Sequence, residues 1–247
     1  MKTKKVIAIN SSKRKMNTYK ILREIKEKLK PYDIEVEIIN LFDYNFTECI
    51  GCELCIRKNK CSLDDDVDII MNRLRNADGI ILSSPVYMGN VCGRMKTFID
   101  RFAKWFHRPE LVGKPAMIVV TTAASGLKNT TKYLKDVSIQ WGMMPTSIIT
   151  RKVNNIKDNL IFEEYQGFIN HLQEDKIKYK PSLNQIIMYQ VQKVLAVKVL
   201  DIDKNYWQKN NWINKVYYYD ANISIPKKII GNLFYKILFN KVKKTEN

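Results

Sequence analysis

The sequence predicts an α/β protein with a doubly wound parallel sheet of about five strands, followed by a mostly helical C-terminal extension. Up to about residue 150, short apolar runs alternate with segments whose apolar residues recur every three or four positions. Strands buried on both faces have the first pattern, and crossover helices have the second. After Arg151 strand-like runs become scarce, and the chain is rich in Lys and Tyr.

The expected strands are short and nearly continuous in apolar residues, and each is followed by an amphipathic segment. Right-handed crossovers place every strand-to-helix loop at one edge of such a sheet, so we expect the functional residues in these loops. The expected strands are residues 5–9, 35–40, 79–83, 116–121 and a fifth at 145–150, and the expected crossover helices are residues 18–30, 67–76, 93–106 and 129–141.

Two regions are expected along the chain. Residues 1–180 contain the sheet, and residues 181–247 form a basic, aromatic, mainly helical extension; Pro181 and the lysines before it mark the division. Within the extension, residues 227–244 place apolar groups at helical spacing with lysines at both ends. We expect this helix to dock on its own protein or across a dimer, with peripheral membrane contact as the alternative.

The net charge of +17 suits nucleic acid, an anionic membrane surface or an acidic redox partner, and an ordinary solvated basic surface explains it equally well. Charge alone does not choose among these partners. The apolar run near the N-terminus, residues 6–9, is too short for a signal sequence or a membrane span. We therefore expect a cytoplasmic protein.

The loop after the first expected strand, residues 10–18, is rich in hydroxyl groups, amides and positive charge. A helix that starts at its end would offer free N–H groups and a favourable dipole to an anion. The loop contains neither G-x-G-x-x-G nor G-x-x-x-x-G-K-[ST], so a mononucleotide phosphate fits better than a dinucleotide or a P-loop nucleotide. The alternative is an ordinary helix N-cap at Asn17. The candidate phosphate-binding residues are Ser11, Ser12, Arg14, Asn17 and Thr18.

The loop after the third expected strand contains a rigid proline, an aromatic residue and a glycine. Pro85 and Gly89 would let backbone groups approach a flat polar heterocycle, and Tyr87 offers an aromatic face. The candidate residues of this loop are Ser84, Pro85, Val86, Tyr87, Met88, Gly89 and Asn90.

Together with the first loop, this segment resembles the flavodoxin-like family of NAD(P)H-dependent FMN reductases. The resemblance covers roughly the first 150 residues, and it implies a flavodoxin-like fold with FMN at the carboxyl ends of the strands. It implies that the FMN phosphate lies at the first loop and the ring beside the second. The loop after the fourth strand resembles the third flavin-contacting loop of the family, which implies contacts at Thr122, Ser125 and Gly126, although it has fewer glycines than is typical.

Four of the five cysteines crowd into residues 49–61, the cysteine loop, with the spacing C-x2-C-x2-C-x5-C. Four close thiolates can hold one metal centre. The spacing is similar to that of the iron–sulfur flavoproteins, a branch of the same family, and so implies a [4Fe–4S] cluster on Cys49, Cys52, Cys55 and Cys61. Tetrahedral zinc and free thiols are the alternatives. Cys92 is expected to be a buried small side chain.

No hydrolytic or acid–base arrangement is visible, and we assign no catalytic side chain. Neither His107 nor His171 has sequence neighbours that suggest a dyad, and residues 64–66, three consecutive Asp, are expected to cap the helix that follows.

The resemblance implies an FMN-dependent oxidoreductase that takes electrons from NAD(P)H or ferredoxin, and we expect a homo-oligomer, a dimer or larger. The electrons would pass through cluster and flavin to an acceptor that the sequence does not identify. The alternatives are a non-enzymatic flavodoxin-type carrier and a zinc-stabilised basic module that binds nucleic acid or membrane. The flavin loops argue against the nucleic-acid reading.

Overall fold

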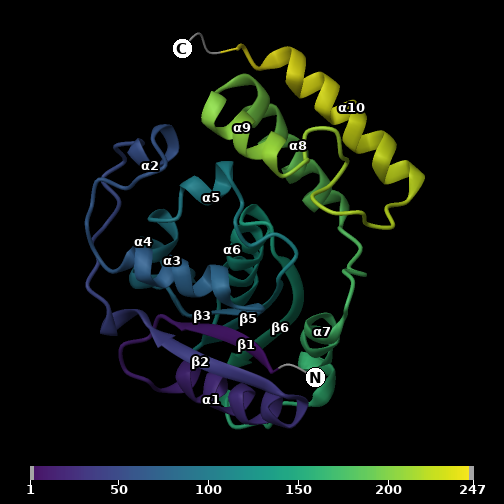
Figure 1. The fold of residues 1–247 in the computed structure, drawn as a ribbon. Helices are drawn as coiled ribbons and strands as arrows, with labels where there is room; N and C mark the ends of the chain where they lie inside the picture. The colour runs from purple at the N-terminus through teal and green to yellow at the C-terminus, as the bar shows by residue number, and fades with distance from the viewer. Residues whose placement is uncertain (1–2, 245–247) are drawn as a thin grey trace.

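The fold, seen in a computed structural model that describes residues 3–244, is built on a parallel sheet (Figure 1). Strand order is β2-β1-β3-β5-β6, the flavodoxin-like order, and the short strand β4 pairs antiparallel with the end of β3. The predicted fold class is therefore confirmed. The strands are β1 Lys4–Asn10, β2 Ile34–Asn40, β3 Gly79–Tyr87, β4 Asn90–Val91, β5 Pro115–Thr122 and β6 Met144–Lys152.

Helices cover both faces of the sheet, as the alternating pattern predicts (Figure 1). One face packs against α1 and α7, and the other packs against α3, α4 and α6. These helices are α1 Asn17–Leu29, α3 Val67–Asn76, α4 Gly93–Asp100, α6 Leu127–Gln140 and α7 Phe162–Gln173. Two four-residue helices, α2 Leu54–Arg57 and α5 Lys104–His107, and 3-10 turns at Lys30–Tyr32, Leu41–Asp43 and Val153–Asn155 complete this part of the chain.

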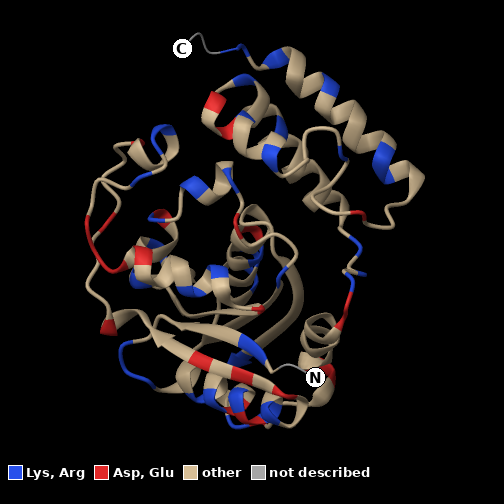
Figure 2. Cartoon of the chain, in the orientation of Figure 1, with Lys and Arg blue, Asp and Glu red and all other residues tan. Residues whose placement is uncertain are grey.

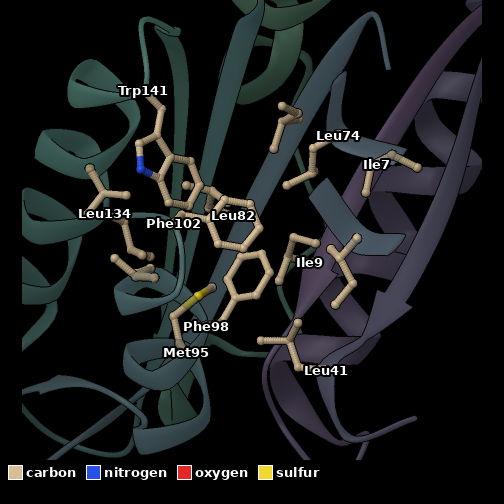
Figure 3. Close-up of a cluster of buried hydrophobic side chains, with 14 of the residues drawn as sticks. Ile7, Ile9, Leu41, Leu74, Leu82, Met95, Phe98, Phe102, Leu134 and Trp141 are labelled. Atoms are coloured by element: carbon tan, nitrogen blue, oxygen red, sulfur yellow. The ribbon is translucent and has the colours of Figure 1, made fainter. Parts of the chain in front are cut away.

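An aromatic group fills the core between the sheet and helices α3, α4 and α6 (Figure 3). Phe102 stacks on Trp141 with ring centroids 5.0 Å apart, and Phe98 lies 4.5 Å from Phe102. Both phenylalanines are fully buried, and each such side chain contributes about 1.5–3 kcal/mol. This core holds α4 and α6 against the strands whose ends carry the candidate site.

The structure corrects one predicted helix. Residues 93–106 form two helices rather than one, because the hydrogen-bond ladder tightens between them. Phe102 N–H donates to Ile99 O at 3.0 Å, and Trp105 N–H donates to Phe102 O at 2.9 Å, both of which are i to i−3 bonds. The interruption contains neither Pro nor Gly, so the sequence gives no local signal for it.

The extension is helical, as predicted, with α8 Leu183–Lys198, α9 Asp201–Lys209 and α10 Ile225–Lys241. An aromatic cluster that includes Tyr189, Trp207 and Tyr218 holds it together. The extension also contacts the sheet region, because the amide of Gln192 on α8 donates to Phe106 O at 2.6 Å and to Gln140 O at 2.8 Å. The predicted division near residue 180 lies in the irregular segment between α7 and α8, and division into two units stays a prediction.

The docked position predicted for the last helix is observed within this chain, since α10 packs along α8. No helix between residues 3 and 244 combines the length and apolar character that crossing a membrane requires.

A buried ionic contact ties the extension to the region before β5. The carboxylate of Asp203 on α9 is fully buried; it accepts a hydrogen bond from the guanidinium of Arg108, and one of its oxygens lies 3.0 Å from His107 Nδ1. Arg108 also donates to the carbonyls of Cys55 and Ile56 in the cysteine loop. A single side chain of the extension therefore fixes the arginine that holds the cysteine loop.

Replacing this carboxylate should strongly destabilise the protein. We expect Asp203→Ala to lower the free energy of unfolding by about 3–5 kcal/mol, because it leaves the buried Arg108 charge without its partner. Denaturant unfolding measures the effect. Asp220→Ala is the matched control, because its carboxylate is 96% exposed beside Lys215, and such a pair is worth about 0–1 kcal/mol. Equal effects of the two variants would contradict the anchoring role of Asp203.

Candidate functional site

The carboxyl ends of β1, β3 and β5 and the loops after them meet around one cavity of about 220 Å³, here called the edge cavity; β3 runs on to Tyr87, so residues 84–87, expected in a loop, are strand. The three strands are parallel, so all three loops leave the same edge of the sheet. Eight of the residues predicted from the sequence to bind the flavin line this cavity. They are Ser12, Arg14, Asn17, Thr18, Pro85, Val86, Tyr87 and Thr122, and the remaining lining residues are Met16, Thr121, Ala123 and Val153.

The first loop brings the start of α1 to the edge cavity. Helix α1 begins at Asn17 with Met16 at the N-cap, and within residues 3–244 no side chain caps it. The first N–H groups of α1 are thus left for another acceptor. The hydroxyl of Thr18 lies 2.6 Å from that of Thr121 in the buried interior, so Thr18 joins the first loop to β5.

The second loop is a tight hairpin between β3 and β4. Its two turn residues, Met88 and Gly89, have φ values of 48° and 78°, as a type I′ turn requires. Gly126 of the third loop touches it, because a Cβ at this glycine would lie 2.6 Å from Val86 Cγ1 and 3.1 Å from Gly89 Cα. A side chain at Gly126 would push the second and third loops apart.

Seven predicted flavin-contacting residues do not line the edge cavity, and their assignment stays a prediction. Ser11 and Ser84 are buried: Ser11 Oγ donates to Ser83 O at 2.9 Å, and Ser84 Oγ accepts from Cys92 N–H at 3.0 Å. These hydroxyls therefore join the first loop to β3, and β3 to the residue before α4. The other five are Met88, Gly89, Asn90, Ser125 and Gly126, which belong to the second and third loops.

The four clustered cysteines, of which Cys49 and Cys52 are exposed, line one small cavity of about 20 Å³, the cysteine cavity. Burial raises the pKa of the Cys55 thiol, and the neighbouring Cys61, Cys49 and Cys52 thiols raise it further. The pKa of Cys52 is lowered, chiefly by a hydrogen bond with Ser62. The topology thus brings all four sulfurs together, and as thiolates they would repel one another.

Four thiols around one cavity are a suitable donor set for an iron–sulfur cluster or for zinc. Across residues 3–244, however, no group of three or more His, Cys, Asp or Glu side chains is arranged to hold a metal ion. A positive charge lies beside the thiols. The guanidinium of the buried Arg101 donates a hydrogen bond to Cys61 Sγ at 3.5 Å. This guanidinium would offset the negative charge of a thiolate at Cys61.

Arg101 also closes the cysteine loop by a buried pair with Asp65. Its guanidinium donates to both carboxylate oxygens, at 2.6 and 3.0 Å, and to Thr47 O at 2.9 Å. Burial by itself would raise the pKa of Asp65, but hydrogen bonds from Arg101 and from the N–H groups of Val67 and Thr47 outweigh it and lower that pKa below the ordinary 3.8. Asp65 accepts a hydrogen bond from the N–H of Val67, the first residue of α3, and anchors the loop, but no side chain caps the helix from its N-cap residue Asp66, contrary to what was expected of the acidic run.

Sequence reasoning missed the residues that position the cysteine loop, namely Arg101, Arg108 and Asp203. A signal existed for Arg101, which is three residues from Phe98 and four from Trp105, on an otherwise apolar face. No comparable signal marks Asp203, which meets His107 and Arg108 from about 95 residues away. His107 therefore has an acidic partner that its sequence neighbours do not reveal.

The lowered pKa of Asp65 predicts a pH dependence of stability. A depressed carboxyl pKa contributes stability that is present above about pH 3.8 and is lost as the pH falls through the folded-state pKa. We expect Asp65→Asn to cost about 3 kcal/mol at neutral pH, since Arg101 loses its partner, and to reduce the further loss of stability in acid. Denaturant midpoints across the acid range measure both effects.

Asp64→Asn is the control for that series, because it removes an exposed carboxylate one residue earlier. Its midpoints should follow those of the unmodified protein at every pH. An Asp65→Asn protein that lost stability in acid as steeply as the unmodified protein would refute the assignment to Asp65.

Comparison with known proteins agrees with this geometry. Residues 4–155 match the family model for NADPH-dependent FMN reductase. An iron–sulfur flavoprotein of Archaeoglobus fulgidus is 29% identical over 221 residues, which is 85% of this chain and 100% of that protein. An iron–sulfur flavoprotein of Methanocaldococcus jannaschii is 44% identical over 98 residues, 39% of this chain and 51% of the relative, so this match spans only about half of that protein.

Among solved structures, a flavone reductase has the same fold, with a TM-score of 0.55 and 16% identity over 71% of this chain and 66% of that one. The family match covers every strand of the sheet and all three loops of the edge cavity. The chain therefore belongs to the NADPH-dependent FMN reductase family and is an oxidoreductase.

Proposed function

We propose that this chain binds FMN in the edge cavity and carries a [4Fe–4S] cluster on the cysteine loop, and so moves electrons between a reduced donor and an acceptor. One observation carries the proposal. The ends of three parallel strands and the loops that follow them line one cavity, and four cysteines from the loop after the neighbouring strand β2 line another. The first cavity lies at the carboxyl ends of the strands, where ligands of open α/β sheets bind.

The first loop suits the FMN phosphate. The start of α1 supplies N–H groups and the positive end of the helix dipole, and Arg14 at the cavity wall supplies a full positive charge. Ser12 and Asn17 add side-chain groups that can bind phosphate oxygens. The cavity volume is below the roughly 300–1,000 Å³ of whole small-molecule sites, which suits part of a ligand whose remainder lies along the second loop.

The second loop suits the ring. Pro85 and Val86 form an apolar wall, and Tyr87 is 54% exposed, so its ring is free to contact a flat heterocycle. The lining of the edge cavity contains no Asp, Glu, His or Cys. FMN itself supplies the chemistry, since it accepts hydride and releases single electrons. The chain's own residues would bind and orient it.

The cysteine loop suits an anionic cluster. Its backbone is held by Arg108 at Cys55 and Ile56, and by Arg101 at Thr47, while Arg101 also reaches a thiol. Rigid attachment keeps a redox centre in one place, and the buried guanidinium favours the added negative charge. Binding of iron would also remove the repulsion among the thiolates that raises the pKa of Cys55.

Reduced nicotinamide, NADPH or NADH, is the donor that the family membership supports, with ferredoxin as the alternative. The acceptor stays unidentified. The cytoplasmic location and the homo-oligomer expected from the sequence also stay proposals. The exposed Tyr87 and Met88 beside the edge cavity support an oligomer, because a second copy could cover them.

Charge reversal at the first loop should weaken FMN binding. We expect the double variant Arg14→Glu, Asn17→Asp to bind FMN about tenfold to a hundredfold more weakly, because it replaces charge-assisted hydrogen bonds with repulsion of the phosphate. Titration of the flavin-free protein, followed by flavin fluorescence, gives the affinity. Riboflavin, which lacks the phosphate, should lose much less affinity than FMN.

Lys30→Glu is the control, because this exposed lysine follows the opposite end of α1. It should leave the FMN affinity nearly unchanged. If the double variant bound FMN as tightly as the control, or lost riboflavin affinity equally, the phosphate would not lie at the first loop.

Anaerobically purified protein should contain about four irons and four sulfides per chain, together with a broad iron–sulfur absorbance beside the flavin bands. Cys52→Ser and Cys55→Ser should each lose the cluster. Cys92→Ser is the control: this cysteine is buried, as expected, and its thiol donates to Ser11 O at 3.2 Å outside the cysteine cavity. Stoichiometric zinc, or flavin without iron, would refute the cluster and leave a plain FMN reductase.

A further inference from the structure

One face of helix α10 packs against helix α8. Gly231 lies against α8 so closely that a Cβ there would come within 2.7 Å of Ile186 Cγ2. On the same side, Lys193 Nζ lies 4.7 Å from the ring centre of Tyr235, and Lys198 Nζ lies 3.9 Å from that of Phe239. These contacts fix the rotation of α10 about its axis.

The opposite face of α10 is apolar and exposed. Residues 225, 229, 233 and 237 follow one another at four-residue spacing, which places them in one stripe along the helix. Their exposed fractions run from 49% at Ile237 to 72% at Ile225. We call this set the outer face of α10; its members are Ile225, Ile229, Ile230, Leu233 and Ile237. Isolated exposed apolar residues are ordinary, but a continuous stripe of five indicates a contact surface.

The charged residues of α10 itself are all positive. Helix α10 carries lysines at 227, 228, 236 and 241 and no Asp or Glu, and Lys243 and Lys244 follow it. Figure 2 shows α10 with lysine positions along its length and no acidic position. By contrast, α9 beside it carries both signs of charge. Apolar residues on one face with lysines at the sides and ends are typical of helices that lie in a lipid interface.

We propose that the outer face of α10 docks on an anionic lipid surface, with the helix lying in the plane of the interface. Its apolar side chains would enter the boundary between headgroups and acyl chains, while Lys228, Lys236 and Lys241 contact anionic headgroups. The 17 residues of α10 span roughly 26 Å as a helix. That length suits a helix lying along a surface. Helix α8 and the rest of the chain would then lie on the side of α10 that faces away from the lipid.

Charge complementarity selects this partner over a second copy of the chain. A symmetric dimer through the outer face would bring two lysine-bearing, acid-free helices together, and like charges facing one another oppose association. An anionic bilayer offers an apolar layer and negative charge in the arrangement that the stripe and its lysines match. This inference does not depend on the flavin or on the cysteines.

Vesicle co-sedimentation of the full chain tests the proposal. The protein should bind vesicles of mixed phosphatidylglycerol and phosphatidylcholine at least about tenfold more tightly than vesicles of phosphatidylcholine alone, and added salt should weaken the binding. The variant Ile229→Ser, Leu233→Ser should bind the anionic vesicles about tenfold more weakly, as should the variant Lys228→Gln, Lys236→Gln, Lys241→Gln. All five positions are exposed, so both variants should keep the fold.

Matched controls change the same residue types elsewhere. Ile69→Ser with Ile148→Ser removes two exposed isoleucines of α3 and β6, and Lys26→Gln with Lys30→Gln removes exposed lysines near the end of α1. Both should bind vesicles as the unmodified protein does. The proposal is overturned if the unmodified chain does not prefer anionic vesicles, or if the α10 variants bind them as the controls do. A dimer that Ile229→Ser, Leu233→Ser dissociates without affecting vesicle binding would assign the face to self-association instead.

Discussion

Parallel pairing of β1, β3 and β5 is the constraint on which both candidate sites depend. Asn10 of β1 pairs with Ser83 of β3, and Pro85 of β3 pairs with Thr121 of β5, so the three strands end side by side. Loops separated by more than 30 residues in sequence therefore share one edge. Because β2 pairs with β1 in the same direction, the cysteine loop leaves from that edge as well.

Buried ionic pairs then give the cysteine loop a definite position. Arg101 with Asp65, and Arg108 with Asp203, hold the loop from two sides although neither arginine belongs to it. Such pairs cost desolvation, and apolar residues of the same volume would often be as stable. Their directional hydrogen bonds to loop carbonyls hold the backbone in a fixed position around four cysteines whose thiolate forms would repel one another, which apolar packing cannot do.

The sequence predicted what depends on local pattern. Helix α3 matches its expected bounds, and the five long strands lie where apolar runs placed them, because burial imposes a periodicity that the chain itself displays. The break after Asp100 and the contact between Asp203 and His107 were not predictable in this way. The first is a change in hydrogen bonding without a breaker residue, and the second joins side chains that only the tertiary fold brings together.

The extension shows why composition alone says little about partners. A net charge of +17 suits several kinds of anionic partner, and α10 has apolar residues on more than one side, so its periodicity does not reveal which side is covered. The close approach at Gly231 decides this, since it turns one side of α10 onto α8. What remains outside is a stripe of five large apolar side chains among lysines. The structure, unlike the net charge, therefore defines a particular surface, and its apolar residues and flanking lysines indicate the kind of partner that it fits.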